Sequence, residues 1–559
     1  MMQRLFNFLN KEVNGLHQAA FLLAFASIGA KVLAIFRDRL LAANFGAGNE
    51  LDIYYAAFRL PDFIYVGSLF FVSLTSLIPF FIEKKKKSAE GGHNFINEIF
   101  TVFLAFMVFS AGVCFFAAPF LTDLIAPGFS EESKRLLIQF TRILLLSPLF
   151  LGLSNLVSGV IQSFNRFFIY SLSGVLYNAG SILGLIILYP KFGMAGVVWG
   201  VVIGAALHFL IQVPSLVNLG YVPKISFNIR WIEVWKVIWN SFPRTLSLTL
   251  NQIVLLVLTA IASFLASGSI SMFNLASNLQ AIPLTVIALS YSVAAFPALA
   301  RNFIEKQNGK FLSSVVASFR HILFWLLPFS ALLIVLRAQV VRSVLGAGAF
   351  SWTDTRLTAA ALALFSFSLF AQGLILLFSR AFYAAERNKV PLLVNLFSSV
   401  ATIFFAAIFI WMLHSCVFFR SFLTGVLRVE DVSGAAFLAL PLAYSLGSVL
   451  NFFLLFWAFE KEIGSISEAL EGIWQIVLNA FFMACVAYLG LNIFDDFFDL
   501  DTFFGIFTQG FLSGLLAFLF GFFLLRLLKN KELNDLTISF KNRVFRKFVI
   551  KPEPEEIHE

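Results

Sequence analysis

Long apolar runs alternate with short polar joints over nearly the whole chain. A helix needs about 20 mostly apolar residues to cross the hydrocarbon core of a bilayer, and runs of that length recur throughout. The pattern predicts an all-α integral membrane protein of about fourteen transmembrane helices. The predicted helices are 16–42, 52–82, 96–126, 134–162, 167–189, 193–219, 231–266, 271–300, 313–341, 355–384, 390–413, 436–459, 468–493 and 502–528.

The composition excludes a water-soluble fold. Of the 559 residues, 59% are hydrophobic and 13% are charged, whereas soluble domains carry roughly 25% charged residues. The net charge of +9 does not indicate a nucleic-acid partner, because most Lys and Arg residues lie in the joints, where they encode topology. The three cysteines lack metal-ligand spacing, so we expect no cofactor and no metal. Residues 1–18 lack a cleavage site, which favours a retained first helix over a signal peptide.

The joints after the even-numbered helices carry the basic residues. These residues are Lys84–Lys87, Lys224, Arg230, Lys306, Lys310, Arg387 and Lys389. The positive-inside rule then places these joints and both termini in the cytoplasm, and the acidic stretch 495–501 outside. The run Lys84–Lys87 has the alternative of binding anionic lipid headgroups. The joint 414–435 fits least well, because Arg420 and Arg428 would lie on the outer side.

Short motifs recur at an offset of about 220 residues. Gly46 and Pro61 recur as Gly268 and Pro283, and the segment 127–129 recurs as 347–350. Together these matches favour a duplication of six helices. An even number of helices gives parallel repeats, related by an axis along the membrane normal with a substrate site between them.

The predicted organisation has four parts. It consists of an N-terminal six-helix lobe (1–219), a C-terminal six-helix lobe (220–460), two additional helices (461–528) and a charged cytoplasmic tail (529–559).

Charged residues inside the apolar runs are the candidate functional groups. Each costs on the order of 2.5–3.5 kcal/mol at a helix centre, so they must face protein or water. They are Lys31, Arg37, Asp38, Asp52, Arg59, Asp62, Arg142 and Arg244. Polar stripes at helical spacing also occur, namely Arg244, Ser247 and Asn251, and Ser271, Asn274 and Asn278. These stripes predict a wet, mildly cationic cavity suited to an anionic headgroup. The alternative is structural ion pairing, as Lys31–Asp38 and Asp52–Arg59–Asp62.

The segment Lys31–Gly48, followed by Asp52 and Ala57–Pro61, resembles the opening signature of the MurJ/MviN family of lipid II flippases. This family belongs to the multidrug/oligosaccharidyl-lipid/polysaccharide exporter superfamily. Ala262–Ser269 and Phe382–Tyr383 are similar to later landmarks. The resemblance implies two lobes around a cationic cavity that opens alternately to each side, with two extra helices bordering a groove for the polyprenyl tail.

Carried over by position, Lys31, Arg37, Asp52 and Arg59 match cavity or gate positions of that family. The chain departs from the family pattern where basic residues are expected, and those positions are Tyr65, Val66 and Asn278. The departures bear on the cargo more than on the fold.

We therefore predict a monomeric flippase, not an enzyme, that moves lipid II from the inner to the outer leaflet of the bacterial cytoplasmic membrane. The predicted headgroup ligands are Lys31, Arg37, Arg59, Arg244 and Asn278. Asp38 and Asp52 would pair with the basic residues when the headgroup is absent. The partners are lipid II and membrane lipids, without nucleic acid. Alternative functions are a flippase for another polyprenyl-pyrophosphate-linked glycan, a multidrug-type exporter, a membrane glycosyltransferase and a membrane scaffold.

Overall fold

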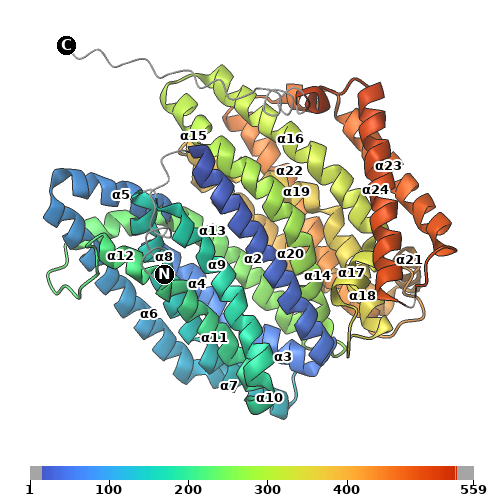
Figure 1. Ribbon diagram of the computed structural model, residues 1–559, viewed down its shortest axis with the longest axis horizontal. Helices are drawn as coiled ribbons and strands as arrows, with labels where there is room; N and C mark the ends of the chain where they lie inside the picture. The colour runs from blue at the N-terminus through green and yellow to red at the C-terminus, as the bar shows by residue number, and fades with distance from the viewer. Residues whose placement is uncertain (1–15, 73, 165, 501, 536, 538–559) are drawn as a thin grey trace, which may run out of the picture.

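The computed structural model describes residues 16–72, 74–164, 166–500, 502–535 and 537, and every regular element in them is a helix (Figure 1). The first half contains α2 (Leu16–Phe45), α3 (Asn49–Ala57), α4 (Arg59–Val72), α5 (Leu74–Lys87), α6 (Ala89–Ile125), α7 (Glu131–Leu144), α8 (Leu146–Ser163), α9 (Phe167–Leu183), η1 (Gly184–Leu188), α10 (Tyr189–Phe192), α11 (Met194–Leu210) and α12 (Val213–Asn218). Most of these bounds lie close to the predicted runs.

The second half continues the same alternation. It contains α13 (Trp231–Ala262), α14 (Ser269–Pro283), η2 (Leu284–Leu289), α15 (Ser290–Ile304), α16 (Asn308–Val335), α17 (Arg337–Leu345), α18 (Trp352–Phe367), α19 (Leu369–Ala384), α20 (Lys389–Ser415), α21 (Val417–Leu427), η3 (Ala435–Leu438), α22 (Ala439–Glu462), η4 (Ser467–Leu470), α23 (Ile473–Asp495) and α24 (Phe503–Leu527). The predicted class, an all-helical membrane protein, is confirmed. Residues 1–15 of the segment predicted to be retained, and most of the predicted tail, fall outside the described residues.

Eleven helices of the described chain are long and apolar enough to cross a bilayer, or twelve if α18 and α19, bent by 44°, form one span. The predicted count of about fourteen is not confirmed. The helix α2, which carries four charged residues between Lys31 and Arg39, and the broken run α3–α5 are not among the eleven.

The predicted single helix 52–82 is interrupted between α3 and α4. Pro61 has no N–H to bond the carbonyl of Ala57, and its ring crowds that carbonyl. The helix α3 accordingly ends at Ala57, and α4 begins at Arg59 with Pro61 in its first turn. The recurring Pro283 also marks an irregularity, because the π-helix η2 follows it directly.

The alternating helices place two kinds of joint at opposite ends of the bundle. We call one the glycine end, because its turns contain Gly46, Gly128, Gly268 and Gly348. It lies toward the bottom of Figure 1, where α3, α7 and α10 are labelled. We call the other the basic end, because its joints carry most of the basic residues named above.

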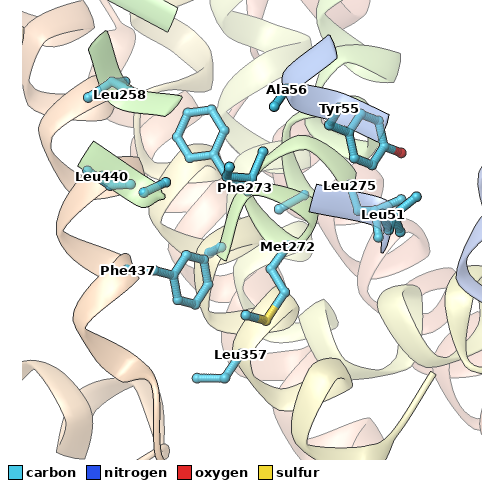
Figure 2. Close-up of a cluster of buried hydrophobic side chains, with 14 of the residues drawn as sticks. Leu51, Tyr55, Ala56, Leu258, Met272, Phe273, Leu275, Leu357, Phe437 and Leu440 are labelled. Carbon is cyan, nitrogen blue, oxygen red and sulfur yellow. The ribbon is translucent and has the colours of Figure 1, made fainter. Parts of the chain in front are cut away.

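The described residues form two large apolar clusters, each drawn mainly from one half, and a larger cluster shared by both. Phe81 and Phe103 belong to a cluster of the first half that also includes Val234 and Val237 of α13, and Phe319 and Phe378 belong to a cluster of the second half. The largest cluster takes residues from both halves near the glycine end. Figure 2 shows part of it, with Leu51 of α3 beside the side chains of α14. Hydrophobic burial therefore joins the halves most extensively at the glycine end.

The last two helices pack against each other and on the outside of α16 and α17 (Figure 1). The Arg320 guanidinium of α16 holds the chain around them, because it donates to the backbone carbonyls of Glu471 at 2.7 Å and Glu468 at 3.2 Å. Arg320 also pairs with Glu532, which is 3% exposed. At the other end, the Arg39 guanidinium lies 5.1 Å from the centre of the Phe503 ring.

Candidate functional site

Two turns, one from each half, meet at the glycine end with their backbones in contact. A Cβ atom at Gly46 would lie 2.7 Å from the Ala349 carbonyl oxygen, and one at Gly348 would lie 2.3 Å from that of Ala43. Both glycines have positive φ, at 60° and 55°. Ala349 N–H donates to the Ala43 carbonyl at 2.8 Å. Only glycine accommodates this approach in this conformation.

A second pair of turns meets in the same way. A Cβ atom at Gly128 would lie 2.4 Å from the Ser263 carbonyl oxygen. The turn with Gly268 also touches the turn of Gly46, because a Cβ atom at Gly268 would lie 2.1 Å from the Ala47 carbonyl oxygen. Gly128 N–H also donates to the Ser263 hydroxyl at 3.0 Å. Position 268 lies 222 residues after 46, and position 348 lies 220 residues after 128, so the repeat relates the contact between the turns of Gly46 and Gly348 to the contact between the turns of Gly268 and Gly128. This reciprocity supports the duplication, and the lobe boundaries remain a prediction.

Asp52 fixes the start of α14. Its carboxylate, 3% exposed, accepts hydrogen bonds from Gly268 N–H at 2.7 Å, Ser271 N–H at 2.7 Å and the Ser271 hydroxyl at 2.5 Å. An anion at this position satisfies free N–H groups and the positive end of the helix dipole. Asp52 does not form the expected ion pair with Arg59, because both of its carboxylate oxygens accept hydrogen bonds from the start of α14 in the other half.

Arg59 also reaches across to the second half of the chain. Its Nε donates to the Thr259 hydroxyl of α13 at 2.7 Å, and its Nη2 donates to the Asn274 side-chain oxygen of α14 at 2.9 Å. The ion pairs of the described residues do not include the expected Arg59–Asp62 pair. Arg59 is 6% exposed and makes these bonds to neutral groups.

A third link joins α9, α2 and α14. The Arg37 Nη2 lies 2.8 Å from the Asp38 Oδ1, and the Arg37 Nη1 donates to the Asn178 oxygen at 3.3 Å. Asn278 donates to the other Asp38 oxygen at 3.0 Å. The expected Lys31–Asp38 pair is absent from the ion pairs of the described residues, and Lys31 is half-buried on α2.

The predicted polar stripe of α14 is therefore one side of an interface between the halves. Each of its three residues binds a charged residue of the first half, so the stripe does not line a wet surface here. We call these contacts the seam, and its residues are Asp38, Asp52, Arg59, Ser271, Asn274 and Asn278.

Arg244 lies away from the seam, beside a residue that the sequence analysis missed. It is close enough to Arg380 of α19 for the two like charges to repel each other. The Arg380 Nη1 donates to the Leu289 carbonyl at 3.2 Å. We call Arg244 and Arg380 the arginine pair. Arg380 was overlooked because it lies near the end of the predicted run 355–384, where a basic residue is expected to contact the headgroups of membrane lipids.

The positions that depart from the family pattern carry no substitute charge. The Tyr65 phenol accepts a hydrogen bond from Asn155 of α8 at 3.0 Å, and Val66 is buried. Within the described residues, no group of three His, Cys, Asp or Glu side chains could hold a metal ion.

The basic end is bridged on one side. Lys84 of α5 pairs with Glu233 of α13 at 2.5 Å, and Arg230 pairs with Glu98 of α6 at 2.8 Å. Part of the predicted topology signal thus forms an interlobe contact. The orientation of the chain in the membrane remains a prediction.

Comparisons with known proteins extend over most of the chain. A family model described as lipid II flippase MurJ matches residues 41–508. A probable lipid II flippase MurJ of Buchnera aphidicola subsp. Schizaphis graminum is 29% identical over 481 residues, covering 83% of this chain and 86% of the relative. The lipid II flippase MurJ of Burkholderia cenocepacia is 24% identical over 448 residues, covering 78% and 81%.

Solved structures share the fold. A lipid II flippase MurJ in an inward closed conformation matches with a TM-score of 0.72 and 23% identity, covering 91% of this chain and 100% of that one. An inward-facing multidrug resistance transporter of the MATE family in the MOP superfamily matches with a TM-score of 0.60 and 16% identity, covering 79% and 96%.

Proposed function

Because this chain belongs to the MurJ family of lipid II flippases, we propose that it carries lipid II from the inner to the outer leaflet of the bacterial cytoplasmic membrane. The chain is a multi-pass membrane protein, and the family gives it the role of a transporter. Lipid II is a disaccharide-peptide linked through pyrophosphate to a polyprenyl tail. Its polar headgroup crosses an apolar core only if protein groups replace water around it.

The seam is the observation that carries this proposal. Two halves joined by polar bonds and glycine contacts at one end can part there and close elsewhere, as alternating access requires. The described structure is then the state in which the glycine end is shut. With the basic end in the cytoplasm, as the positive-inside rule expects, that shut end faces the outside.

The seam also divides the predicted headgroup ligands into two groups. Arg59 and Asn278 use their hydrogen bonds across the closed seam, and Arg37 binds Asp38 of the seam and Asn178 within the first half. Lys31 and Arg244 lie off the seam. We assign the first contacts with the cargo to Lys31 and Arg244, and contacts after the seam opens to Arg37 and Arg59. In this scheme Asp38 and Asp52 act as gate residues.

We assign the polyprenyl tail to the region of α23 and α24, which the family places beside the tail. Large apolar side chains on α24 are exposed, among them Phe504, Phe511 and Phe523. Such a surface suits both membrane lipids and a polyprenyl chain. One copy of the chain supplies both lobes, so we propose a monomer.

Depletion in the host tests the cargo directly. We expect lipid II to accumulate in the inner leaflet, and purified protein in vesicles to expose fluorescent lipid II to an outside reagent. The second candidate is a flippase for another polyprenyl-pyrophosphate-linked glycan, which the departures at Tyr65, Val66 and Asn278 favour. Accumulation of that glycan, with lipid II unchanged, would decide for the second candidate.

A further inference from the structure

The joint 414–435 contains a short helix, α21, at the glycine end of the bundle. The helix has 11 residues and is about 16 Å long, so it cannot cross a hydrocarbon core of roughly 30 Å. It follows α20, which begins at the basic end and ends at Ser415, soon after an exposed Trp411. The Arg337 Nη2 of α17 donates to the Leu427 carbonyl at the end of α21 at 3.0 Å (Figure 1). Tryptophan near a helix end is typical of the membrane–water interface, so α21 lies at the membrane surface.

One face of α21 is apolar and is turned away from the protein. Four of its apolar side chains are between 59% and 80% exposed, namely Val417, Phe418, Phe422 and Val426. Leu423 and Leu427 on the opposite face are buried. An amphipathic helix at a membrane surface buries its apolar face about 5–10 Å into the boundary between headgroups and acyl chains. The polar side of α21 is therefore at the level of the lipid headgroups.

A cavity of about 510 Å³ opens beside α21 at this level. Its volume is within the range of about 300–1,000 Å³ that small-ligand sites occupy. The walls come from the end of α20, from α21 and from the loop after it, and their polar side chains include His414, Arg420, Ser421 and Glu430. Arg420 lies three residues before the buried Leu423, so it projects from the face of α21 that is turned toward the protein.

The walls of the cavity carry one basic and one acidic side chain. In the part of the chain that the structure describes, neither Arg420 nor Glu430 takes part in an ion pair or a side-chain hydrogen bond. The nearby Arg356 of α18 instead pairs with Asp431 and donates to the Arg428 carbonyl at 2.7 Å, which holds the loop in place. Because Arg420 and Glu430 do not pair with each other either, the two charges face the cavity separately.

The acidic part of the cavity has a defined geometry. A Cβ atom at Gly425 would lie 2.7 Å from the Glu430 Oε1, so the absence of a side chain on this residue makes room for the carboxylate. The His414 Nδ1 donates to the Ile410 carbonyl at 2.9 Å, which leaves the Nε2 of the neutral ring as an acceptor. The cavity thus offers a carboxylate and an imidazole nitrogen as acceptors, and a guanidinium as donor.

A lipid headgroup that carries both charges matches these groups. Arginine binds phosphate oxygens through paired N–H donors, and a primary ammonium donates up to three hydrogen bonds. We propose that the cavity binds phosphatidylethanolamine from the leaflet at the glycine end, with its phosphate on Arg420 and its ammonium on Glu430. Its acyl chains then lie in the bilayer beside the apolar face of α21. The loop wall packs through Gly434 against Ala266, so the lipid adjoins the turn of Gly268 that the seam holds.

Native mass spectrometry of the delipidated full chain tests this site. The probe is an equimolar mixture of phosphatidylethanolamine, phosphatidylcholine and phosphatidylglycerol, and the readout is the ratio of the singly bound complexes. Choline has no N–H group and phosphatidylglycerol has no positive charge, so the wild-type protein should retain phosphatidylethanolamine best. The variants are Arg420→Gln and Glu430→Gln. The controls are Glu50→Gln and Arg301→Gln, which change exposed residues elsewhere and should leave every ratio unchanged.

The two variants should shift the ratio of phosphatidylethanolamine to phosphatidylglycerol in opposite directions. Glu430→Gln should lower it about two- to fivefold, because one exposed ion pair to the ammonium is lost. Arg420→Gln should weaken the binding of all three lipids but raise this ratio, because the remaining carboxylate repels the anionic lipid.

Three results would overturn the proposal. One is a ratio that moves in the same direction in both variants, or in neither, since a merely structural defect does not reverse sign. Another is equal binding of phosphatidylethanolamine and phosphatidylcholine by the wild-type protein. The third is displacement of the lipid by an equal concentration of glycerophosphoethanolamine, because the cavity would then bind a soluble solute. The readout is lipid binding, so the result is independent of the identity of the cargo.

Discussion

Replacing Asp52 with Asn tests whether the seam holds the glycine end shut. The carboxylate accepts three hydrogen bonds on its two oxygens, one from Gly268 N–H and two from Ser271. Asparagine has nearly the same shape but only one accepting oxygen, so its NH₂ group must face an N–H donor. The substitution also removes the negative charge at the start of α14.

The expected loss follows from these contacts. One lost hydrogen bond to a charged group costs about 1.5–3 kcal/mol, and the lost charge at the helix start costs about 0.3–1 kcal/mol. The closed state should therefore lose about 2–4 kcal/mol relative to a state in which the halves have parted. This shifts the equilibrium by roughly 30-fold to 1,000-fold.

Electron paramagnetic resonance can measure that shift. Spin labels at positions 44 and 267, both exposed at the glycine end on opposite halves, report their separation. The native cysteines, which are Cys114, Cys416 and Cys485, are first replaced with serine. We expect Asp52→Asn to add a population at longer distance and to slow lipid II flipping.

Glu50→Gln is the matched control, because Glu50 is an exposed carboxylate in the same helical turn. It should leave the distances unchanged. If Asp52→Asn keeps both the wild-type distances and the wild-type flipping rate, the contacts of Asp52 with the start of α14 do not hold the glycine end shut.

Three further changes test other parts of the structure. A cysteine at position 85 should resist an impermeant thiol reagent in intact cells, whereas one at 267 should react; the reverse would invert the topology. Gly348→Ala should weaken closure by at least about 1 kcal/mol, because φ is +55° and the Cβ would meet a carbonyl oxygen at 2.3 Å; unchanged label distances would contradict this. Arg320→Ala should lower the free energy of unfolding by about 3 kcal/mol, because it leaves the buried Glu532 carboxylate without its basic partner. Limited proteolysis should then cut before α23, and resistance equal to that of the wild-type protein would show that Arg320 does not hold the last two helices in place.

Much of the fold was predictable because long apolar runs have few alternatives in a membrane. The predicted end of the third run, 126, lies one residue past the end of α6 at Ile125. The break before Arg59 was also readable in principle, because Pro61 removes the hydrogen bond to Ala57. It was missed because apolar content alone was used to join the run.

The site was predictable only in part. The charged residues of the first half were identified, but their partners were not, because Asp52 binds groups more than 200 positions away in the sequence. Local spacing suggested pairs such as Asp52 and Arg59 on one helix face. The fold instead brings α14 alongside them, and a helix start competes successfully for a carboxylate.

The glycine contacts affect how fast the protein can work. Surfaces that interlock through side chains must withdraw each knob from its hole, with rotamer changes, before they separate. At Gly46, Gly128, Gly268 and Gly348 the two halves touch through main-chain atoms, so these four contacts can part without any side chain being withdrawn. The barrier to parting is then set by the polar bonds of the seam and by the shared apolar cluster beside it, and single substitutions at the polar bonds can tune the turnover rate without changing the glycine contacts.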